Sequence, residues 1–371
     1  MFYPHRPRAV LAAHKKFIFA RLSEGLLFIA FALLYIELNT LSITQILAHF
    51  EATVHLSVSA QIAALLIGLV AFIKCAQLPL HGWLIQVVET PTPISALLHG
   101  GVINLGGFLL ILFAPLFVQA AFAQWTLIIL ASMSTLLSAL IMMTRVSIKV
   151  RLAWSTSAQM GLMLIECALG LYELAILHLL AHSFYKAFAF LHANSEVERH
   201  LRGALGHAYQ PSLMQYVVSF LIAFVLVAIG FNIYHVFDES TVYSPWLLLT
   251  LALSLWLLQS LHGTFITKLK AVFISLIIIA SYGGAKLLMA QLVPPMIASQ
   301  LPNTDLFVCF AIGVCFLSYL AITHKQDSVL AKKIQSSLFG GLYLDEWATK
   351  VTLHVWPTKL PKHHLSRAME Q

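Results

Sequence analysis

Two histidines and a lysine recur at four-residue spacing in the segment HLLAHSFYK, at His178, His182 and Lys186. With about 3.6 residues per helical turn, this spacing places the three side chains on one face of a helix, over about 12 Å. Histidine exchanges protons near neutral pH, so such a column, bridged by water, is suited to pass protons. His192 is expected to extend the same face. The segment therefore predicts a proton-conducting helix.

The same column has two other interpretations. A histidine pair at i, i+4 can bind zinc, but the cationic Lys186 on the stripe opposes metal charge, and the glutamate of an HExxH motif is missing. We therefore expect this chain to hold no metal. Ordinary hydrogen bonding between helices, without transport, remains as the second alternative.

Other charged residues lie within apolar runs, where each costs roughly 2.5–3.5 kcal/mol on insertion scales and so needs a reason. Lys74 lies well inside such a run, and a buried or hydrated pocket is expected around it. Lys286 lies near the end of its run, from which a lysine can reach the membrane surface. Glu24 follows Arg21 by three residues, so it either pairs with Arg21 on one helix face or joins the ion path.

A break is predicted in the helix that carries Lys74. In KCAQLPLHGW, Pro79 removes a backbone donor and clashes with the preceding turn, and Gly82 weakens the helix that would continue. Transporters place ion sites at such breaks. His99 lies one to two turns into the next span and is expected to face the Lys74 region. The predicted proton path comprises Lys74, His99, His178, His182, Lys186 and Glu24.

The elements that carry these residues are predicted to be membrane-spanning helices. Apolar residues make up 60% of the 371 positions, charged residues 10%, and the mean hydropathy is +0.86, far from the balance of a water-soluble domain. Runs of about twenty nearly uncharged residues cross hydrocarbon as helices, and the alternating pattern of a β-barrel is not seen. The fold class is therefore an all-α, polytopic bundle of about ten spans, which we place near residues 17–37, 59–80, 93–114, 121–143, 149–167, 171–192, 213–236, 244–262, 270–291 and 305–323.

The basic residues predict the orientation of these spans. The net charge is +7, but lysines and arginines fall on alternate loops. By the positive-inside rule, both termini lie in the cytoplasm. We place the chain in the inner (cytoplasmic) membrane. The basicity thus reflects topology, and no nucleic acid is implied. No Walker, dinucleotide, nucleophile-elbow or haem motif appears, which argues against a self-contained redox or ATP-driven enzyme.

The chain divides into a basic cytoplasmic segment at 1–16, a transmembrane proton-translocating domain at 17–323 and a cytoplasmic tail at 324–371. In the tail, apolar residues recur at helical spacing beside charged ones, at Leu344, Trp347, Val351 and Val355. This pattern predicts an amphipathic helix. The helix lies at the membrane interface or packs on a partner subunit.

The run KCAQLPLHGWL followed by ETPTPISALLHGG resembles the signature of a known family, the proton-translocating, antiporter-like membrane subunits of respiratory complex I (NADH:quinone oxidoreductase subunit L) and of multisubunit sodium/proton antiporters. IKVRLAWSTSAQMGLM and HLLAHSFYKAFAFL extend the resemblance over most of residues 15–195. It implies two five-helix repeats in inverted topology, with broken helices and a central hydrophilic axis. Lys74 would be the central lysine of the first repeat, and the column ending at Lys186 would be the relay into the second.

Three departures from the family pattern limit what can be carried over. The N-terminal helices, including a glutamate that partners the Lys74-type residue, have no counterpart, so the first repeat is incomplete; the chain is truncated, or a separate polypeptide supplies them. In a later span, a lysine follows a Gly-Phe pair in complex I, whereas Gly230 and Phe231 lead here to Asn232. Proton exit would therefore differ. The long lateral helix is absent, which argues against membership of complex I.

Within the family, AWSTSAQMGLM, LAHSFYKAFAFLHANSEV and GLYLDEWATKVTLHVWP are most similar to the membrane subunits of bacterial inorganic-carbon transporters. This resemblance implies that the chain conducts protons or sodium to drive bicarbonate or CO2 accumulation with a DabA-like, zinc-containing cytoplasmic partner. The chain itself would hold no cofactor. The first alternative is a proton-pumping subunit of an NADH-quinone oxidoreductase or cation/proton antiporter complex. The second is a non-conducting membrane anchor.

Overall fold

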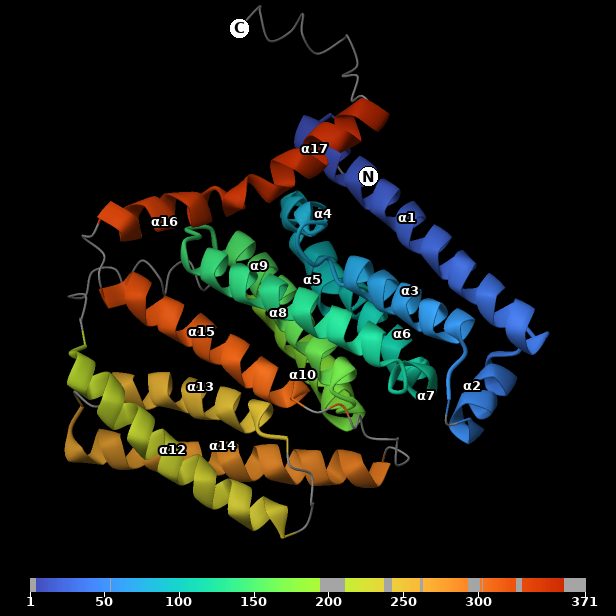
Figure 1. Ribbon diagram of the computed structural model, residues 1–371. Helices are drawn as coiled ribbons and strands as arrows, with labels where there is room; N and C mark the ends of the chain where they lie inside the picture. The colour runs from blue at the N-terminus through green and yellow to red at the C-terminus, as the bar shows by residue number, and fades with distance from the viewer. Residues whose placement is uncertain are drawn as a thin grey trace, which may run out of the picture. The chain divides into compact units, whose positions relative to one another are not determined.

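The computed structural model describes residues 5–53, 55–193, 211–236, 242–260, 263–292, 301, 303–324 and 329–356. The regular secondary structure in these residues is entirely helical (Figure 1). The helices that coincide with the ten predicted spans are α1 (Pro7–Leu38), α3 (Val58–Lys74), α5 (Thr92–Gly100) with α6 (Leu105–Leu112), α8 (Ala121–Met143), α9 (Ile148–Ala168), α10 (Tyr172–Leu191), α12 (Leu213–His235), α13 (Ser244–Ser260), α14 (Phe265–Leu292) and α15 (Thr304–His324). The predicted all-α fold is therefore confirmed.

The remaining elements are short. They are α2 (Ile43–Ala52), α4 (Gly82–Gln86), η1 (Val87–Glu89), η2 (Val102–Asn104), α7 (Ala114–Phe117), α16 (Val329–Phe339), η3 (Gly341–Tyr343) and α17 (Leu344–Val355). The last three belong to the tail, in which α17 fulfils the prediction of a helix there.

Many of the long helices are suited to lipid. Within the described residues, seven helical segments are long and apolar enough to cross a membrane, and two shorter apolar helices, α3 and α13, accompany them. Large apolar side chains on these helices are exposed, among them Ile36 at 77%, Phe184 at 78% and Phe265 at 79%. Exposed apolar side chains of this kind are unfavourable in water but favourable among lipid tails. The chain is a multi-pass membrane protein.

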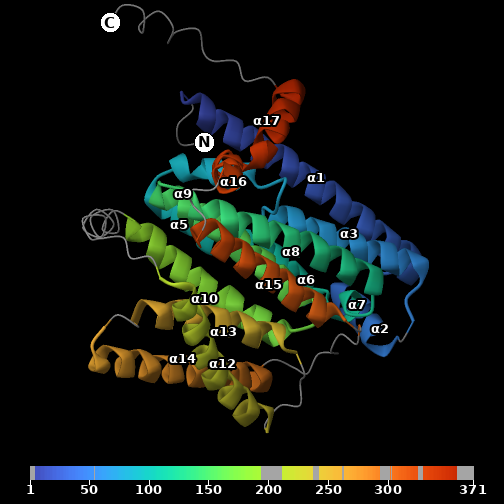
Figure 2. The same cartoon turned by 60° about the vertical axis from the view of Figure 1, so that its left-hand side comes forward.

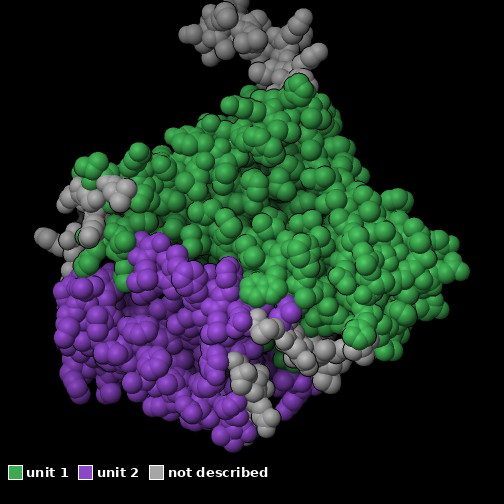
Figure 3. Space-filling view, viewed as in Figure 1, with its two compact units in different colours: residues 1–197, 296–299, 319–371 green, residues 198–295, 300–318 purple. Residues whose placement is uncertain are grey.

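The chain forms two compact units, shown in different colours in Figure 3. Unit 1 comprises residues 1–197, 296–299 and 319–371, and unit 2 comprises residues 198–295 and 300–318. In unit 1, α8 packs along α9, α1 along α3, and α10 against α5 and α9 (Figures 1 and 2). All the predicted path residues lie in unit 1.

Two helices of unit 1 are interrupted. As predicted, the helix of Lys74 breaks: α3 ends at this residue, a turn follows through the cis peptide between Leu78 and Pro79, and α4 begins at Gly82. The next span also breaks, between α5 and α6, where Gly101 has φ −124° and ψ −72°. At this second position a single span over 93–114 was predicted, without a break at Gly101.

Glycines of the second broken helix allow close packing. A Cβ atom at Gly106 would lie 2.4 Å from the Ala71 carbonyl oxygen, and one at Gly107 would lie 2.2 Å from Cε of Met163. Contacts this short leave no room for a side chain, so α6 lies directly against α3 and α9.

Unit 2 has an aromatic core between α12, α13 and α14. Tyr234 and Trp246 are buried there, with ring centroids 5.5 Å apart. Lys286 of α14 is only 5% exposed, and its ammonium lies 4.6 Å from the centre of the Tyr234 ring. The expectation that Lys286 reaches the membrane surface was therefore wrong: the aromatic face attracts the cation into the core.

Candidate proton path

The Lys74 side chain lies beside a carboxylate at the first break. Its ammonium is 3.7 Å from Oε1 of Glu24 on α1, and the lysine side chain is 30% exposed. The same carboxylate accepts a hydrogen bond from Nη2 of Arg21 at 2.8 Å, as the sequence predicted. Glu24 thus faces two cations. Only the contact with Arg21 was predicted, because the approach of α3 to α1 cannot be read from local spacing.

The three residues of the α10 column share one face of that helix, as predicted. His178 and Lys186 contact α9, and His182 is buried. Nδ1 of His178 lies 3.0 Å from both carboxylate oxygens of Glu166 on α9. The rings of His178 and His182 are 6.2 Å apart. Neither ring nitrogen of His182 has a hydrogen-bond partner among the described residues. His182 is therefore a buried imidazole whose donor nitrogen and acceptor nitrogen are both available for proton exchange.

Lys186 ends this column in a fully buried position. Its ammonium donates to Oγ of Ser155 at 2.8 Å and to the carbonyl oxygen of Leu152 at 3.3 Å, both on α9. None of the ion pairs among the described residues involves Lys186. A buried cation that is held by neutral dipoles alone is costly, which makes this side chain the strongest functional candidate in the chain.

His99 lies against α9 and α10. Its Nδ1 is 3.2 Å from Oγ1 of Thr156, and its ring stacks on Phe190 at 4.4 Å. The expectation that His99 faces the Lys74 region was wrong, because α5 packs on α10. Gly100 makes this packing possible: a Cβ atom there would lie 2.9 Å from the Ser183 carbonyl oxygen. His99 instead lies within electrostatic reach of Lys186.

Small polar residues of α8 and α9 connect the first break to this cluster. The buried amide of Gln77 donates to the carbonyl oxygens of Cys75 at 2.9 Å and Ser157 at 3.0 Å. The Ser157 hydroxyl donates to the Ala76 carbonyl oxygen at 3.2 Å. Backbone groups freed by the break are thus satisfied by α9, and Ser157 neighbours the Thr156 that contacts His99. These hydrogen bonds and the contact of Thr156 with His99 form a polar strip along α9, which was not predicted.

An open pocket reaches the Lys186 end of the strip. It has a volume of about 690 Å³, and its lining includes Arg151, Ser155, Tyr185 and His192. His192 is exposed and lies at the end of α10, so the expectation that it extends the buried column was wrong. The helix turns this position away from the face of Lys186. His192 instead borders an opening from which water can approach Ser155.

Two signals in the sequence could have identified the missed residues. Glu166 lies in the apolar run LMLIECA and needs a partner by the same cost argument that was applied to Lys186. The run STS at 155–157 gathers three hydroxyls within one span. Among the described residues, no group of three His, Cys, Asp or Glu side chains could hold a metal ion. That the chain holds no cofactor stays a prediction.

The helical fold with its broken helices is that of an antiporter-like membrane subunit. Residues 1–216 match the family "NADH:quinone oxidoreductase/Mrp antiporter, TM", and the chain belongs to this family. An Mrp complex structure from Dietzia sp. DQ12-45-1b shares its fold, with a TM-score of 0.55 at 19% identity, over 98% of this chain and 46% of that chain.

Two relatives within the family are similar to this chain over nearly its whole length, and both are subunits of the same kind. The probable inorganic carbon transporter subunit DabB of Hydrogenovibrio crunogenus is 46% identical over 97% of this chain and 69% of its own length. The probable inorganic carbon transporter subunit DabB2 of Halothiobacillus neapolitanus is 35% identical over 97% of this chain and 67% of its own length. The predicted resemblance to subunits of this kind is confirmed.

Proposed function

We propose that this chain conducts protons, or sodium ions, as the membrane subunit of a complex that accumulates bicarbonate or CO2. The observation that carries the conduction is Lys186, a fully buried ammonium held by Ser155 and a carbonyl oxygen rather than by a carboxylate. The inorganic-carbon substrate is inferred from the similarity to the two DabB subunits. A DabA-like, zinc-containing partner would perform the carbon chemistry.

The proposed route runs through two connected groups of residues. Protons reach Lys186 through the open pocket that Ser155 lines. His182 can then accept a proton on a ring nitrogen that has no other partner, and Glu166 can balance the charge on His178. The polar strip through Ser157 joins this group to the Lys74 break. Each step exchanges one proton between groups that titrate when buried.

The proposal also includes the orientation of the chain in the membrane and its assembly with a partner subunit. Both termini lie in the cytoplasm, as the distribution of basic loops predicts. The DabA-like subunit then binds on the cytoplasmic side of the inner membrane.

An inorganic-carbon accumulation assay in a strain that depends on this chain and its partner tests the proposal. Lys186→Met keeps the length and volume of the side chain and removes its charge, so we expect accumulation to fall by at least about tenfold. Lys268→Met makes the same change at an exposed position of α14 and should leave accumulation unchanged. Equal accumulation by the wild-type protein and Lys186→Met would refute the proposed path.

A redox-driven pump is the second candidate, because the matching family also contains NADH:quinone oxidoreductase subunits. Purification together with iron-sulfur and quinone-site subunits would favour it over carbon transport. A non-conducting anchor would give wild-type proteoliposomes the same ion flux as those with Lys186→Met.

A further inference from the structure

One carboxylate of the tail contacts both α1 and α4. Asp345 in the first turn of α17 accepts a hydrogen bond from Nζ of Lys15 on α1, with the ammonium 2.6 Å from Oδ1. Its other oxygen, Oδ2, accepts from Nε2 of Gln86 at 3.0 Å. Both cartoon views show α17 beside the first part of α1 (Figures 1 and 2). The last described helix thus contacts the first.

The two partners of this ion pair have very different exposure. The Lys15 side chain is 0% exposed, whereas that of Asp345 is 35% exposed. The carboxylate therefore meets water on one side and a fully buried cation on the other. An arrangement of this kind is what a proton needs in order to pass from water to a buried group.

The carboxylate also occupies the break in the helix of Lys74. A Cβ atom at Gly82 would lie 1.6 Å from Oδ1 of Asp345, so only glycine leaves room for the carboxylate at the start of α4. The neighbouring His81 is buried, and its Nδ1 has no hydrogen-bond partner among the described residues. Gly82 therefore does more than weaken a helix: it opens the notch in which Asp345 lies.

We propose that Asp345 exchanges protons between the water on the tail side of the membrane and the broken helix, with Lys15 as its inner partner. The inference rests on the proposed function and extends it: the tail supplies a residue of the ion path in addition to covering the helix ends.

The exchange balances one proton at a time. From the ion pair, the Lys15 ammonium gives a proton to the unpartnered Nδ1 of His81, which lies within electrostatic reach of both Lys15 and Asp345. This leaves a neutral amine, a cationic imidazole at His81 and the Asp345 carboxylate. A proton from water then binds Asp345 and crosses the 2.6 Å contact to the amine, which restores the pair. The net result is one proton moved from water to His81.

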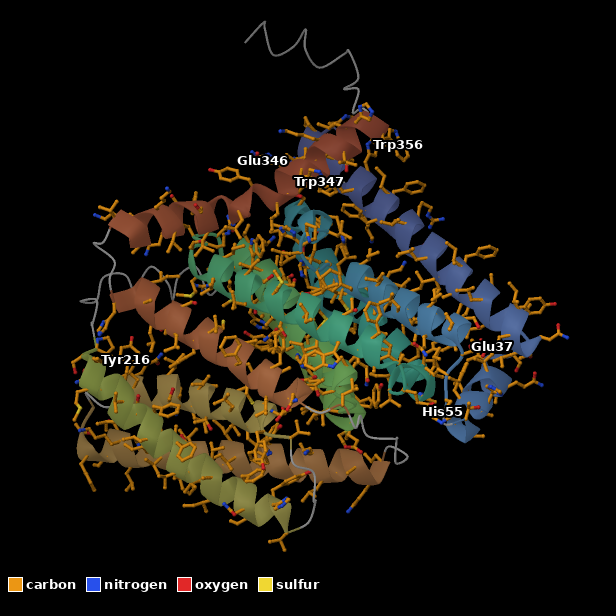
Figure 4. All side chains as sticks on the ribbon, viewed as in Figure 1. Glu37, His55, Tyr216, Glu346, Trp347 and Trp356 are labelled. Atoms are coloured by element: carbon orange, nitrogen blue, oxygen red, sulfur yellow. The ribbon has the colours of Figure 1, made fainter. Side chains whose placement is uncertain are left out.

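A structural tie is the competing explanation of the pair, but the tail has other anchors. His14 of α1 stacks on Trp356 at 4.3 Å, and Figure 4 shows Trp356 beside the first turns of α1. Nη2 of Arg145 donates to the Leu338 carbonyl oxygen at 3.3 Å. Because these contacts do not involve Asp345, an isosteric change at Asp345 should leave the tail docked.

The experiment measures proton flux in proteoliposomes that contain the purified complex. Asp345→Asn keeps the shape and removes the titration, and we expect flux to fall by about tenfold or more. Gly82→Ala expels the carboxylate from its notch and should have the same effect, whereas Asp345→Glu should retain most of the flux. The matched controls are Glu346→Gln, an exposed neighbour on α17 labelled in Figure 4, and Gly25→Ala, where a Cβ atom would meet nothing within 4 Å.

Rescue by formate separates a proton carrier from a structural tie. Because Asp345 is partly exposed, formate added on the tail side should restore flux in Asp345→Asn vesicles. It should not do so in Lys186→Met vesicles, which also report any permeation of the acid itself. Wild-type flux in Asp345→Asn, or a loss that formate does not restore, would overturn the inference. Equal flux in wild-type and Lys186→Met vesicles would instead overturn the proposed function.

Discussion

The ammonium of Lys74 lies 3.7 Å from the carboxylate of Glu24, so the residue at which α3 ends faces a carboxylate on α1. The Arg21 side chain that shares this carboxylate is 60% exposed. Exposed ion pairs contribute about 0–1 kcal/mol because water screens them. The Glu24 carboxylate can therefore leave Arg21 and approach Lys74 at little cost in free energy. The pair of Lys74 and Glu24 is placed to take part in ion transfer at the break.

We predict that Lys74 and Glu24 act as a unit. Lys74→Met should lower proton flux in proteoliposomes by about tenfold or more, and Glu24→Gln should lower it less. The double variant should be no worse than Lys74→Met alone, because residues that act together are not additive. Arg21→Gln serves as the control and should stay near wild type. Additive losses in the double variant would show that the two residues act independently.

A second prediction concerns the unpartnered ring of His182. A buried polar group without a hydrogen bond costs about 1–3 kcal/mol, so His182→Leu should raise the thermal stability of the purified protein while it lowers proton flux. His49→Leu makes the same change at an exposed position of α2 and should do neither. Thermal melting in detergent and flux in vesicles give the two readouts. Reduced stability in His182→Leu would mean that the ring is held by a bond essential to the fold.

A third prediction concerns the hydrogen bond from Lys186 to Ser155. Removal of a bond to a charged group costs about 1.5–3 kcal/mol, so Ser155→Ala should lower the free energy of unfolding by about that amount. In a Lys186→Met background the same change should cost little, because no buried charge remains. The measurement is a double-mutant cycle of thermal stabilities. A similar cost in both backgrounds would place the role of Ser155 elsewhere.

The helices and the first break could be predicted from the sequence because their causes are local. A run of apolar residues of the right length specifies a span, and Pro79 interrupts a helix wherever it lies. The shared face of His178 and Lys186 also follows from helical spacing alone. The second break was missed because Gly101 is compatible with both a continuous and an interrupted helix.

The partners of the site residues could not be predicted because they depend on which helices become neighbours. His99 contacts α9 and α10 rather than Lys74, since small residues let α5 approach α10 closely. The same limit applies to the pair of Lys15 and Asp345, which are separated by 330 residues. Spacing predicts which residues share a face, and packing decides what that face meets.

The final prediction tests the packing that holds the first break. In Gly106→Ala, the new Cβ atom would lie 2.4 Å from the Ala71 carbonyl oxygen and 2.6 Å from Sγ of Cys75. Ala71 belongs to the last turns of α3, and its backbone cannot yield without moving the end of that helix. Overpacking of this kind costs about 1–3 kcal/mol, so thermal stability and proton flux should both fall.

Gly25→Ala is the matched control for this substitution, because a Cβ atom there would meet nothing within 4 Å. Alanine is favoured over glycine by about 1 kcal/mol within a helix, so this variant should melt at the same or a higher temperature than the wild type. The two alanine substitutions are therefore expected to shift the melting temperature in opposite directions. If Gly106→Ala melts like Gly25→Ala and conducts normally, the approach of α6 to α3 is looser than the structure has it, and the break does not depend on that contact.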